Sequence, residues 1–224
     1  MPRHRARSPE AKRSRRDTLH DGARRLLLAS GTFDTLRIHR VAQEVGLAKG
    51  TVYMYFASKE ALLLALFCET LVEWTDALVA APLSPPAPPE ALADALLTAS
   101  AEVPLMAVLS RVLFSALEPS ADLLATSHQE VRAQVDRCCR WLADARDLPT
   151  DDALALLQQL FLVLVGMAQF GTPLAHGGVA AEAPLPTPTQ AVLRSALVHL
   201  MTGWTLRRSL RPRTSAHLDG VASR

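Results

Sequence analysis

Apolar residues recur along most of this chain at the spacing of an amphipathic α-helix. The clearest example lies in residues 37–45, where positions i, i+3, i+4 and i+7 are all apolar. These positions are occupied by Ile38, Val41, Ala42 and Val45. No segment shows a convincing strand alternation, so the pattern predicts an all-α fold.

The N-terminal part is expected to form three helices followed by a longer one. The first covers about 17–29 and the second about 37–45, with Gly46 ending it. A short third helix covers about 49–55. Ser58 is placed to cap a long apolar helix that reaches about residue 81, since a serine side chain can accept from the first free backbone N–H groups.

The remainder begins with "PLSPPAPPE", whose prolines exclude a helix and predict a stiff connector. Two helices are expected after it in residues 90–117, one in about 120–148 and one in about 150–170. A Pro/Gly-rich loop then precedes a last helix that ends near 208. Residues 1–16 are expected to be a disordered basic arm, and residues 209–224 a basic tail.

Charge divides the chain unevenly. Residues 1–60 contain 13 Lys and Arg against 6 Asp and Glu, whereas the rest contains 11 against 16, although the formal net charge is only +2. Because residues 1–60 are basic and the rest of the chain is mildly acidic, a polyanionic partner is expected for residues 1–60 alone. The arm either follows DNA or only aids solubility.

Residues 37–56, "RIHRVAQEVGLAKGTVYMYF", have the spacing of a helix-turn-helix motif. Apolar residues would pack the two helices together, and Gly46 would allow the tight turn. The second helix of such a motif enters the major groove with its first residues at the base edges. The residues left outward there are Lys49, Gly50, Thr51, Tyr53, Met54 and Tyr55.

Each of these side chains has a DNA-contacting and an ordinary interpretation. Lys49 can reach a phosphate or a guanine edge, and Thr51 and Tyr53 can donate to phosphates. Lys59, at the start of the next helix, can contact another phosphate. Alternatively, Tyr53 and Tyr55 are core aromatics at helical spacing and Lys59 is a solvated lysine. Val52 and Phe56 are assigned to the core.

With "VAQEVGLAKGTVYMYFASKEALLLAL", residues 17–76 closely resemble the DNA-binding domain of the tetracycline-repressor (TetR) family. The resemblance implies a homodimeric transcriptional regulator, most often a repressor, released from a palindromic DNA operator by a small ligand. It implies no cofactor and no enzymatic activity. The same resemblance implies that the residues contacting DNA are Lys49, Gly50, Thr51, Tyr53, Tyr55 and Lys59.

Three positions depart from the family pattern. Arg37 stands where a capping Ser or Thr is frequent, and Ala48 replaces a frequent Ser before the Lys-Gly pair. A lost cap costs about 1 kcal/mol, which would not unfold the domain. His39 stands where the family often has a phosphate-contacting Arg, and Arg37 and Arg40 are candidates to compensate.

Residues 82–208 match the family only in architecture, as a helical ligand-sensing and dimerisation domain. A pocket for an apolar or aromatic ligand is expected among the helices between 90 and 170. Arg111, inside an apolar run, must pair, reach water or meet an anionic ligand. The candidate pocket residues are Met106, Arg111, Phe114, Trp141 and Phe161.

The last two long helices carry wide apolar faces and are expected to pair with their symmetry mates in a four-helix dimer interface. One face is formed by Leu157, Leu160, Phe161, Leu164, Val165 and Ala168. The other is formed by Leu193, Ala196, Leu197, Leu200 and Trp204.

The remaining chemistry is sparse. The three cysteines, Cys68, Cys138 and Cys139, form no disulfide framework or metal-ligand set, and we interpret them as buried thiols in a cytoplasmic protein. The longest apolar run, nine residues at 160–168, is too short for a membrane helix. Two alternatives remain: a ligand-independent architectural DNA-binding protein, and an enzyme of the helical body, although no catalytic motif supports the latter.

Overall fold

The computed structural model describes residues 8–30, 36–116, 121–170 and 190–209, and all regular structure in these ranges is α-helical. This confirms the predicted all-α fold. The four helices of the N-terminal part are α1 (Pro9–Ser30), α2 (Ile38–Glu44), α3 (Lys49–Tyr53) and α4 (Lys59–Val79). Those that follow are α5 (Pro89–Glu102), α6 (Pro104–Ala116), α7 (Ala121–Arg146), α8 (Thr150–Phe170) and α9 (Gln190–Ser209).

Helix α1 begins at Pro9, well before the expected start near residue 17, so the expectation of a disordered arm is wrong for residues 9–16. The backbone N–H of Ala11 donates to Ser8 Oγ at 3.1 Å, which caps the helix. Pro9 suits the first helical position, and Glu10 lies in the positive first turn. The sequence "SPEA" contains this capping signal, but the basic composition of residues 1–16 led to the expectation of disorder.

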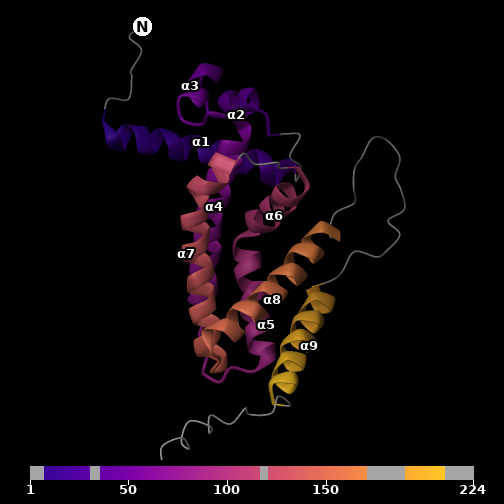
Figure 1. Ribbon diagram of the computed structural model, residues 1–224. Helices are drawn as coiled ribbons and strands as arrows, with labels where there is room; N and C mark the ends of the chain where they lie inside the picture. The colour runs from indigo at the N-terminus through magenta and orange to yellow at the C-terminus, as the bar shows by residue number, and fades with distance from the viewer. Residues whose placement is uncertain (1–7, 31–35, 117–120, 171–189, 210–224) are drawn as a thin grey trace, which may run out of the picture.

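Helices α1, α2 and α3 sit at one end of the molecule, above a bundle formed by the other helices (Figure 1). Their buried apolar side chains form what we call the N-terminal core, which includes Leu19, Leu27, Val41, Val52 and Phe56. Leu62, Leu63 and Leu66 of α4 belong to the same core. The first turns of α4 are therefore part of the N-terminal unit.

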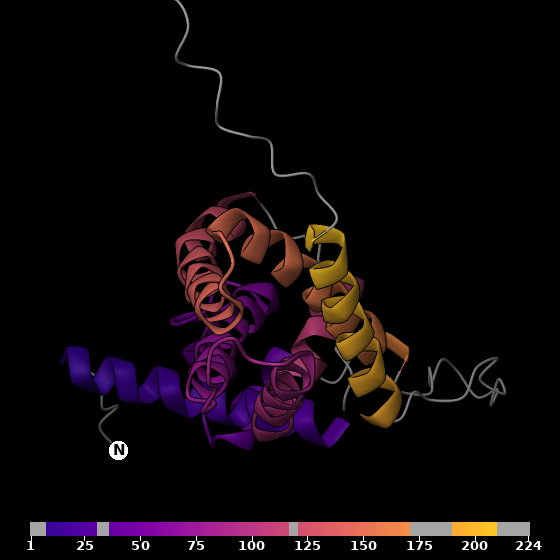
Figure 2. The same ribbon diagram turned by 90° about the horizontal axis from the view of Figure 1, so that it is seen from below.

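The bundle has a second cluster, the C-terminal core, to which α4 also contributes. Leu71, Trp74 and Leu78 pack there, beyond the α4 residues that serve the N-terminal core. The other members of this cluster come mainly from α5 and from α7–α9, and Figure 2 shows these helices together with α4 from below. The capping bond from Ala61 N–H to Ser58 Oγ, 3.1 Å long, starts α4 at the predicted residue.

Helix α6 links the two cores. Leu105, Val108 and Leu109 are buried in the N-terminal core, whereas Met106 faces the C-terminal core. The side chains of α6 beyond Ser110 lie outside the described residues, and these include Arg111 and Phe114. The N-terminal core is thus closed by a helix that follows the proline-rich connector in sequence.

Much of the apolar surface of α8 and α9 that was expected to form the dimer interface packs inside this chain instead. Leu160 and Leu197 are buried in the C-terminal core, and Leu157, Leu164, Leu193, Leu200 and Trp204 pack against it. Among the described side chains of these helices, the large apolar ones that remain exposed are Leu154, Phe161, Leu162, Val192 and Leu206. The sequence pattern could not separate the two faces, because α8 is apolar nearly all round. Within the described ranges, no single helix is long and apolar enough to cross a membrane.

Candidate nucleic-acid interface

The turn between α2 and α3 depends on Gly46, which has φ +66°, a conformation that a side chain disfavours. After it, the backbone N–H of Leu47 donates to the carbonyl of Ala42 at 2.8 Å. Gly22 of α1 allows α2 to approach closely, because a Cβ there would lie 2.5 Å from Val45 Cγ1. Two glycines thus fix the angle of the motif and its distance from α1.

The inward side of the motif is fully packed. Val41, Ala42 and Val52 are at most 2% exposed, and Phe56 is 3% exposed. Val52 and Phe56 therefore belong to the core, as the sequence predicts. Burial of these residues fixes the rotation of α3, so its remaining side chains must face outward.

The outward side of α3 presents a cation and an aromatic ring. Tyr53 is 46% exposed and Met54 is 71% exposed, while Lys49 and Gly50 are also exposed. The Lys49 Nζ lies 5.8 Å from the centre of the Tyr53 ring, within the range of a cation–π contact. Thr51 is half-buried beside them. These residues lie together on the outward side of the motif, where they could enter a groove.

Tyr55 and Lys59 differ from this group. Tyr55 is half-buried and packs against the N-terminal core, so it combines the two interpretations that the sequence left open. Lys59 lies in the first turn of α4 and is half-buried. Either side chain could touch DNA only with its polar tip.

Helix α2 adds three exposed side chains, Arg37, His39 and Arg40. Neither α2 nor α3 has a side-chain cap, as expected from Arg37 and Ala48 at their N-cap positions. The first turn of α3 therefore receives no hydrogen bond from an N-cap side chain, although the Thr51 N–H donates to the carbonyl of Ala48 at 2.8 Å.

The helical extension at the start of α1 adds further positive charge. Lys12, Arg13 and Arg16 are exposed, and Arg15 is half-buried. The Arg16 guanidinium lies 5.1 Å from the centre of the Phe56 ring, which places this turn beside the end of the motif. The extension projects past the bundle on the side of α7 (Figure 1).

A polar network that the sequence analysis missed holds α1 to α4. Arg24 donates to both carboxylate oxygens of Glu73 at 2.7 Å, and the Nδ1 of His20 lies 2.9 Å from Glu69 Oε2. Arg25 Nε also donates to Glu44 of α2 at 2.8 Å. The network could not be read from the sequence because its partners are separated by 19 to 49 positions.

Burial and pairing shift the ionisation of two of these groups. Burial of the His20 imidazole lowers its pKa, and this effect exceeds the opposing influence of the nearby Glu69 carboxylate. The hydrogen bonds that Arg24 donates to the Glu73 carboxylate raise the pKa of Arg24. Arg24 therefore stays charged, while His20 favours the neutral form.

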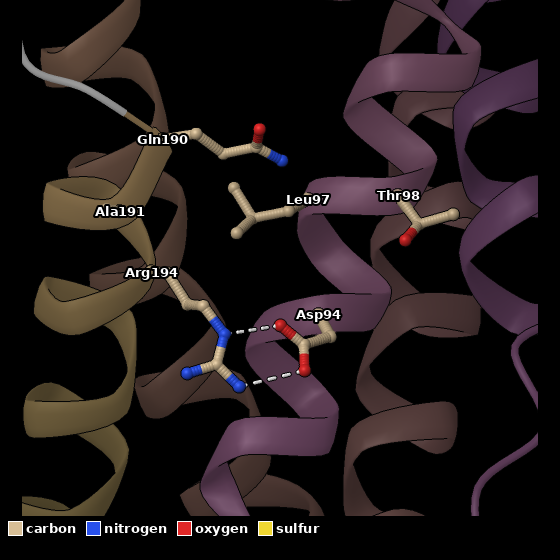
Figure 3. A pocket seen from close by; sticks show the side chains of 6 residues that line it. All are labelled: Asp94, Leu97, Thr98, Gln190, Ala191 and Arg194. Atoms are coloured by element: carbon tan, nitrogen blue, oxygen red, sulfur yellow. Dashed lines mark hydrogen bonds and ion pairs between the residues drawn. The ribbon is translucent and has the colours of Figure 1, made fainter.

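Of the five predicted pocket residues, Arg111 and Phe114 have side chains outside the described residues, and the other three lie on three different helices. Met106 is buried, Phe161 is 36% exposed on α8, and Trp141 is half-buried on α7. One open cavity of about 370 Å³ lies between α5 and α9, and includes none of them. Figure 3 shows its bidentate ion pair, in which Arg194 reaches Asp94 at 2.6 and 2.9 Å.

The three cysteines are buried and free. Burial raises the pKa of Cys68 to about 12 and also raises the pKa values of Cys138 and Cys139. Over the part of the chain that the structure describes, no cluster of His, Cys, Asp or Glu could hold a metal ion. The thiols therefore fill space in the interior.

A helix-turn-helix with an exposed basic helix and a packed inner face, set on a helical bundle, defines the class of helix-turn-helix DNA-binding proteins. Residues 19–66 match the family model described as "Bacterial regulatory proteins, tetR family". Residues 19–66 therefore resemble the DNA-binding domain of the tetR family, and DNA-binding transcriptional regulation is the function that such a domain implies. Among curated proteins, none matches the chain in sequence.

Solved structures share the fold over most of the chain. A transcriptional regulator from Rhodococcus sp. Rha1 has a TM-score of 0.60 at 15% identity, covering 86% of this chain and 96% of its own. A proposed TetR-family regulator from Mesorhizobium loti gives 0.58 at 15% identity, with 86% and 97% covered. FadR from Bacillus subtilis, solved in complex with stearoyl-CoA, gives 0.55 at 17% identity, with 84% and 98% covered. These likenesses extend the fold assignment beyond residues 19–66.

Proposed function

We propose that this protein is a homodimeric repressor that binds a near-palindromic operator and is released by a small apolar or aromatic ligand. The observation that carries the proposal is the outward surface of α3, where Lys49 and Tyr53 stand exposed while Val52 holds the helix against the core. In a two-fold dimer, two such helices would meet half-sites one or more helical turns of about 10 bp apart.

The proposed DNA contacts form three groups. Lys49, Gly50, Thr51, Tyr53 and Met54 of α3 supply the groove-facing contacts. Arg37, His39 and Arg40 of α2 supply phosphate contacts, and the tips of Tyr55 and Lys59 add to these.

Dimerisation is proposed through α8 and α9. Their exposed apolar side chains, among them Leu154 and Leu162 at 38% and 70% exposure, would be covered by the symmetry mate. Light scattering at micromolar concentration tests this directly, and a monomer would contradict it.

The ligand class rests on the apolar interior of the bundle and on one structural relative. FadR from B. subtilis binds stearoyl-CoA, whose acyl chain is apolar. Met106, Arg111, Phe114, Trp141 and Phe161 remain the proposed ligand-responsive residues. A ligand that favours one arrangement of the bundle by about 1–3 kcal/mol would be sufficient to weaken operator binding.

The test is binding of the purified protein to DNA from upstream of its own gene, beside a scrambled duplex of equal length, across a salt series. A specific regulator should prefer its site by about 10³ or more at physiological salt. Equal binding to both duplexes calls for selection from genomic fragments. Failure of that selection would favour an architectural DNA-binding protein, and absence of any DNA binding at low salt would overturn the proposal.

A further inference from the structure

A second open cavity is lined by residues from the ends of α4 and α7. These helix ends lie at the end of the bundle opposite α2 and α3 (Figure 1). The cavity has a volume of about 440 Å³ and is formed by the end of α4, the proline-rich connector and the last turns of α7. Its apolar wall consists of Val79, Ala81, Leu83, Pro85 and Ala145. The cavity is far from the residues proposed to contact DNA.

Hydrogen bonds hold the walls of this cavity in place. The backbone N–H of Ala87 donates to the carbonyl of Ala145 at 2.7 Å, and Arg146 Nη1 donates to the carbonyl of Ala87 at 2.6 Å. Arg137 Nη2 donates to Asp76 Oδ1 at 2.6 Å, which ties α7 to α4. The cavity is therefore preformed, which lowers the cost of binding a ligand.

Two opposite charges line the cavity without being paired. Arg140 and Asp144 lie one turn apart on α7 and are both exposed. In the part of the chain that the structure describes, neither forms a hydrogen bond or an ion pair. An acid that follows a base on a helix is in the less favourable order for pairing, so both groups remain available. The third charged group, Arg137, already pairs with Asp76.

Trp141 lies between these charges in sequence and also lines the cavity. Its indole is half-buried, and its Nε1 makes no hydrogen bond to any described residue. An indole offers a flat apolar face together with one donor at its edge. The cavity thus combines an aromatic face, an aliphatic wall, a guanidinium and a carboxylate.

We propose that this cavity binds a small zwitterion with an apolar body, of the class of aromatic and aliphatic α-amino acids. The ligand carboxylate accepts hydrogen bonds from Arg140, and its ammonium donates to Asp144. Its side chain lies against Trp141 and the apolar wall. A simple anion would leave Asp144 opposing it, and a simple cation would meet Arg140. The cavity between α5 and α9 lacks this feature, because Arg194 and Asp94 already satisfy each other.

The test is isothermal titration of the full-length protein, without DNA, with L-phenylalanine. Two analogues each remove one charge: 3-phenylpropionate lacks the ammonium and 2-phenylethylamine lacks the carboxylate. We expect L-phenylalanine to bind with a Kd of about 1 mM or tighter. Each analogue should bind about tenfold more weakly, the loss expected for a hydrogen bond to a charged group.

Single variants assign each contact. Arg140→Gln should remove the preference for L-phenylalanine over 2-phenylethylamine, and Asp144→Asn should remove the preference over 3-phenylpropionate. Arg132→Gln and Asp136→Asn change exposed residues of the same helix outside the cavity, and should leave binding unchanged. Circular dichroism confirms that each variant is folded.

Absence of binding at about 10 mM L-phenylalanine would overturn the proposal. Equal affinity for 3-phenylpropionate would also overturn it, by indicating a site for simple anions. Unchanged binding by both cavity variants would place the ligand elsewhere. Because no DNA is present, these outcomes do not depend on operator recognition.

Discussion

The imidazole of His20 and the carboxylate of Glu69 meet across α1 and α4, with 2.9 Å between Nδ1 and Oε2. His20 is 6% exposed, and its ring lies 5.2 Å from that of Phe56, the residue that anchors the end of the motif. Its Nε2 is buried without a hydrogen-bond partner among the described residues. The contact therefore couples the packing of the DNA-binding unit to the protonation of one imidazole.

This arrangement predicts that acid destabilises the protein through His20. Because burial lowers the pKa of the folded-state imidazole, the unfolded chain binds the proton first as pH falls through about 6.5. The contribution of the neutral imidazole is thus complete above that pH and is lost as pH falls toward the folded-state pKa. The nearby charges are Arg16, Asp17 and Glu69.

Urea unfolding between pH 5 and pH 8 measures this effect. The free energy of unfolding should fall more steeply with acid in the wild type than in His20→Gln, whose side chain does not titrate. His39→Gln, which replaces an exposed imidazole on α2, is the matched control. Parallel curves for wild type and His20→Gln would show that His20 is not responsible.

The exposed pair on α3 predicts separate losses of DNA affinity. Lys49→Ala and Tyr53→Ala should each weaken binding to a specific site by about tenfold or more, since a good polar contact contributes about 1–3 kcal/mol. Thermal stability should change little, because both side chains are exposed. Arg207→Ala, at an exposed position near the end of α9, is the control for lost positive charge. Fluorescence anisotropy with a labelled duplex distinguishes these outcomes.

The helical extension of α1 predicts a change in the salt dependence of DNA binding. Replacing Lys12, Arg13 and Arg15 by Gln keeps the helix but removes three charges. If the extension contacts phosphates, the slope of log K against log salt should flatten by about 0.9 for each lost contact. An unchanged slope would indicate that the extension makes no phosphate contacts and only aids solubility.

The turn glycine predicts a loss of stability. Gly46→Ala should cost about 1–2 kcal/mol, because its φ of +66° brings a Cβ too close to the backbone carbonyl. Gly203→Ala is the contrasting variant, since open space surrounds that position in α9. It should stabilise the protein by up to about 1 kcal/mol. Denaturant midpoints give both values, and equal effects would contradict the assignment.

The cysteines predict slow modification in the native protein. With thiol pKa values raised by burial, Cys68, Cys138 and Cys139 should react with a thiol-specific disulfide reagent at pH 8 only after unfolding. In denaturant, the reagent should release three equivalents of its reporter thiol per chain, one for each of the three cysteines. Fast release without denaturant would show that a thiol is accessible.

The sequence predicted the motif well because its signals are local. Gly46, the cap at Ser58 and the apolar spacing of α2 each act within one or two helical turns. The signal for the early start of α1 is equally local, because it consists of the cap at Ser8 and of Pro9. The basic composition of residues 1–16 favoured disorder instead, so this signal was not used. Composition is a weaker guide than a capping signal at that position.

The polar network and the cavities could not be predicted, because they depend on the tertiary arrangement. His20 and Glu69 are 49 positions apart, and nothing in either segment indicates the other. Trp141 was expected in a pocket among the helices between 90 and 170, and its place beside Arg140 and Asp144 in an open cavity depends on how α7 meets α4 and the connector. Periodicity identifies which face of a helix is apolar, and the neighbouring helices determine where that face lies.

The entry of α6 into the N-terminal core means that the DNA-binding unit is discontinuous along the chain. A fragment ending at the proline-rich connector would lack Leu105, Val108 and Leu109, and would expose the apolar surface that they cover. Such a fragment should be less stable than the same residues in the intact protein. A chimaera that joins this N-terminal domain to another C-terminal domain would therefore need a complementary helix from the new partner domain. The N-terminal domain should be exchangeable only between proteins whose α6 segments match.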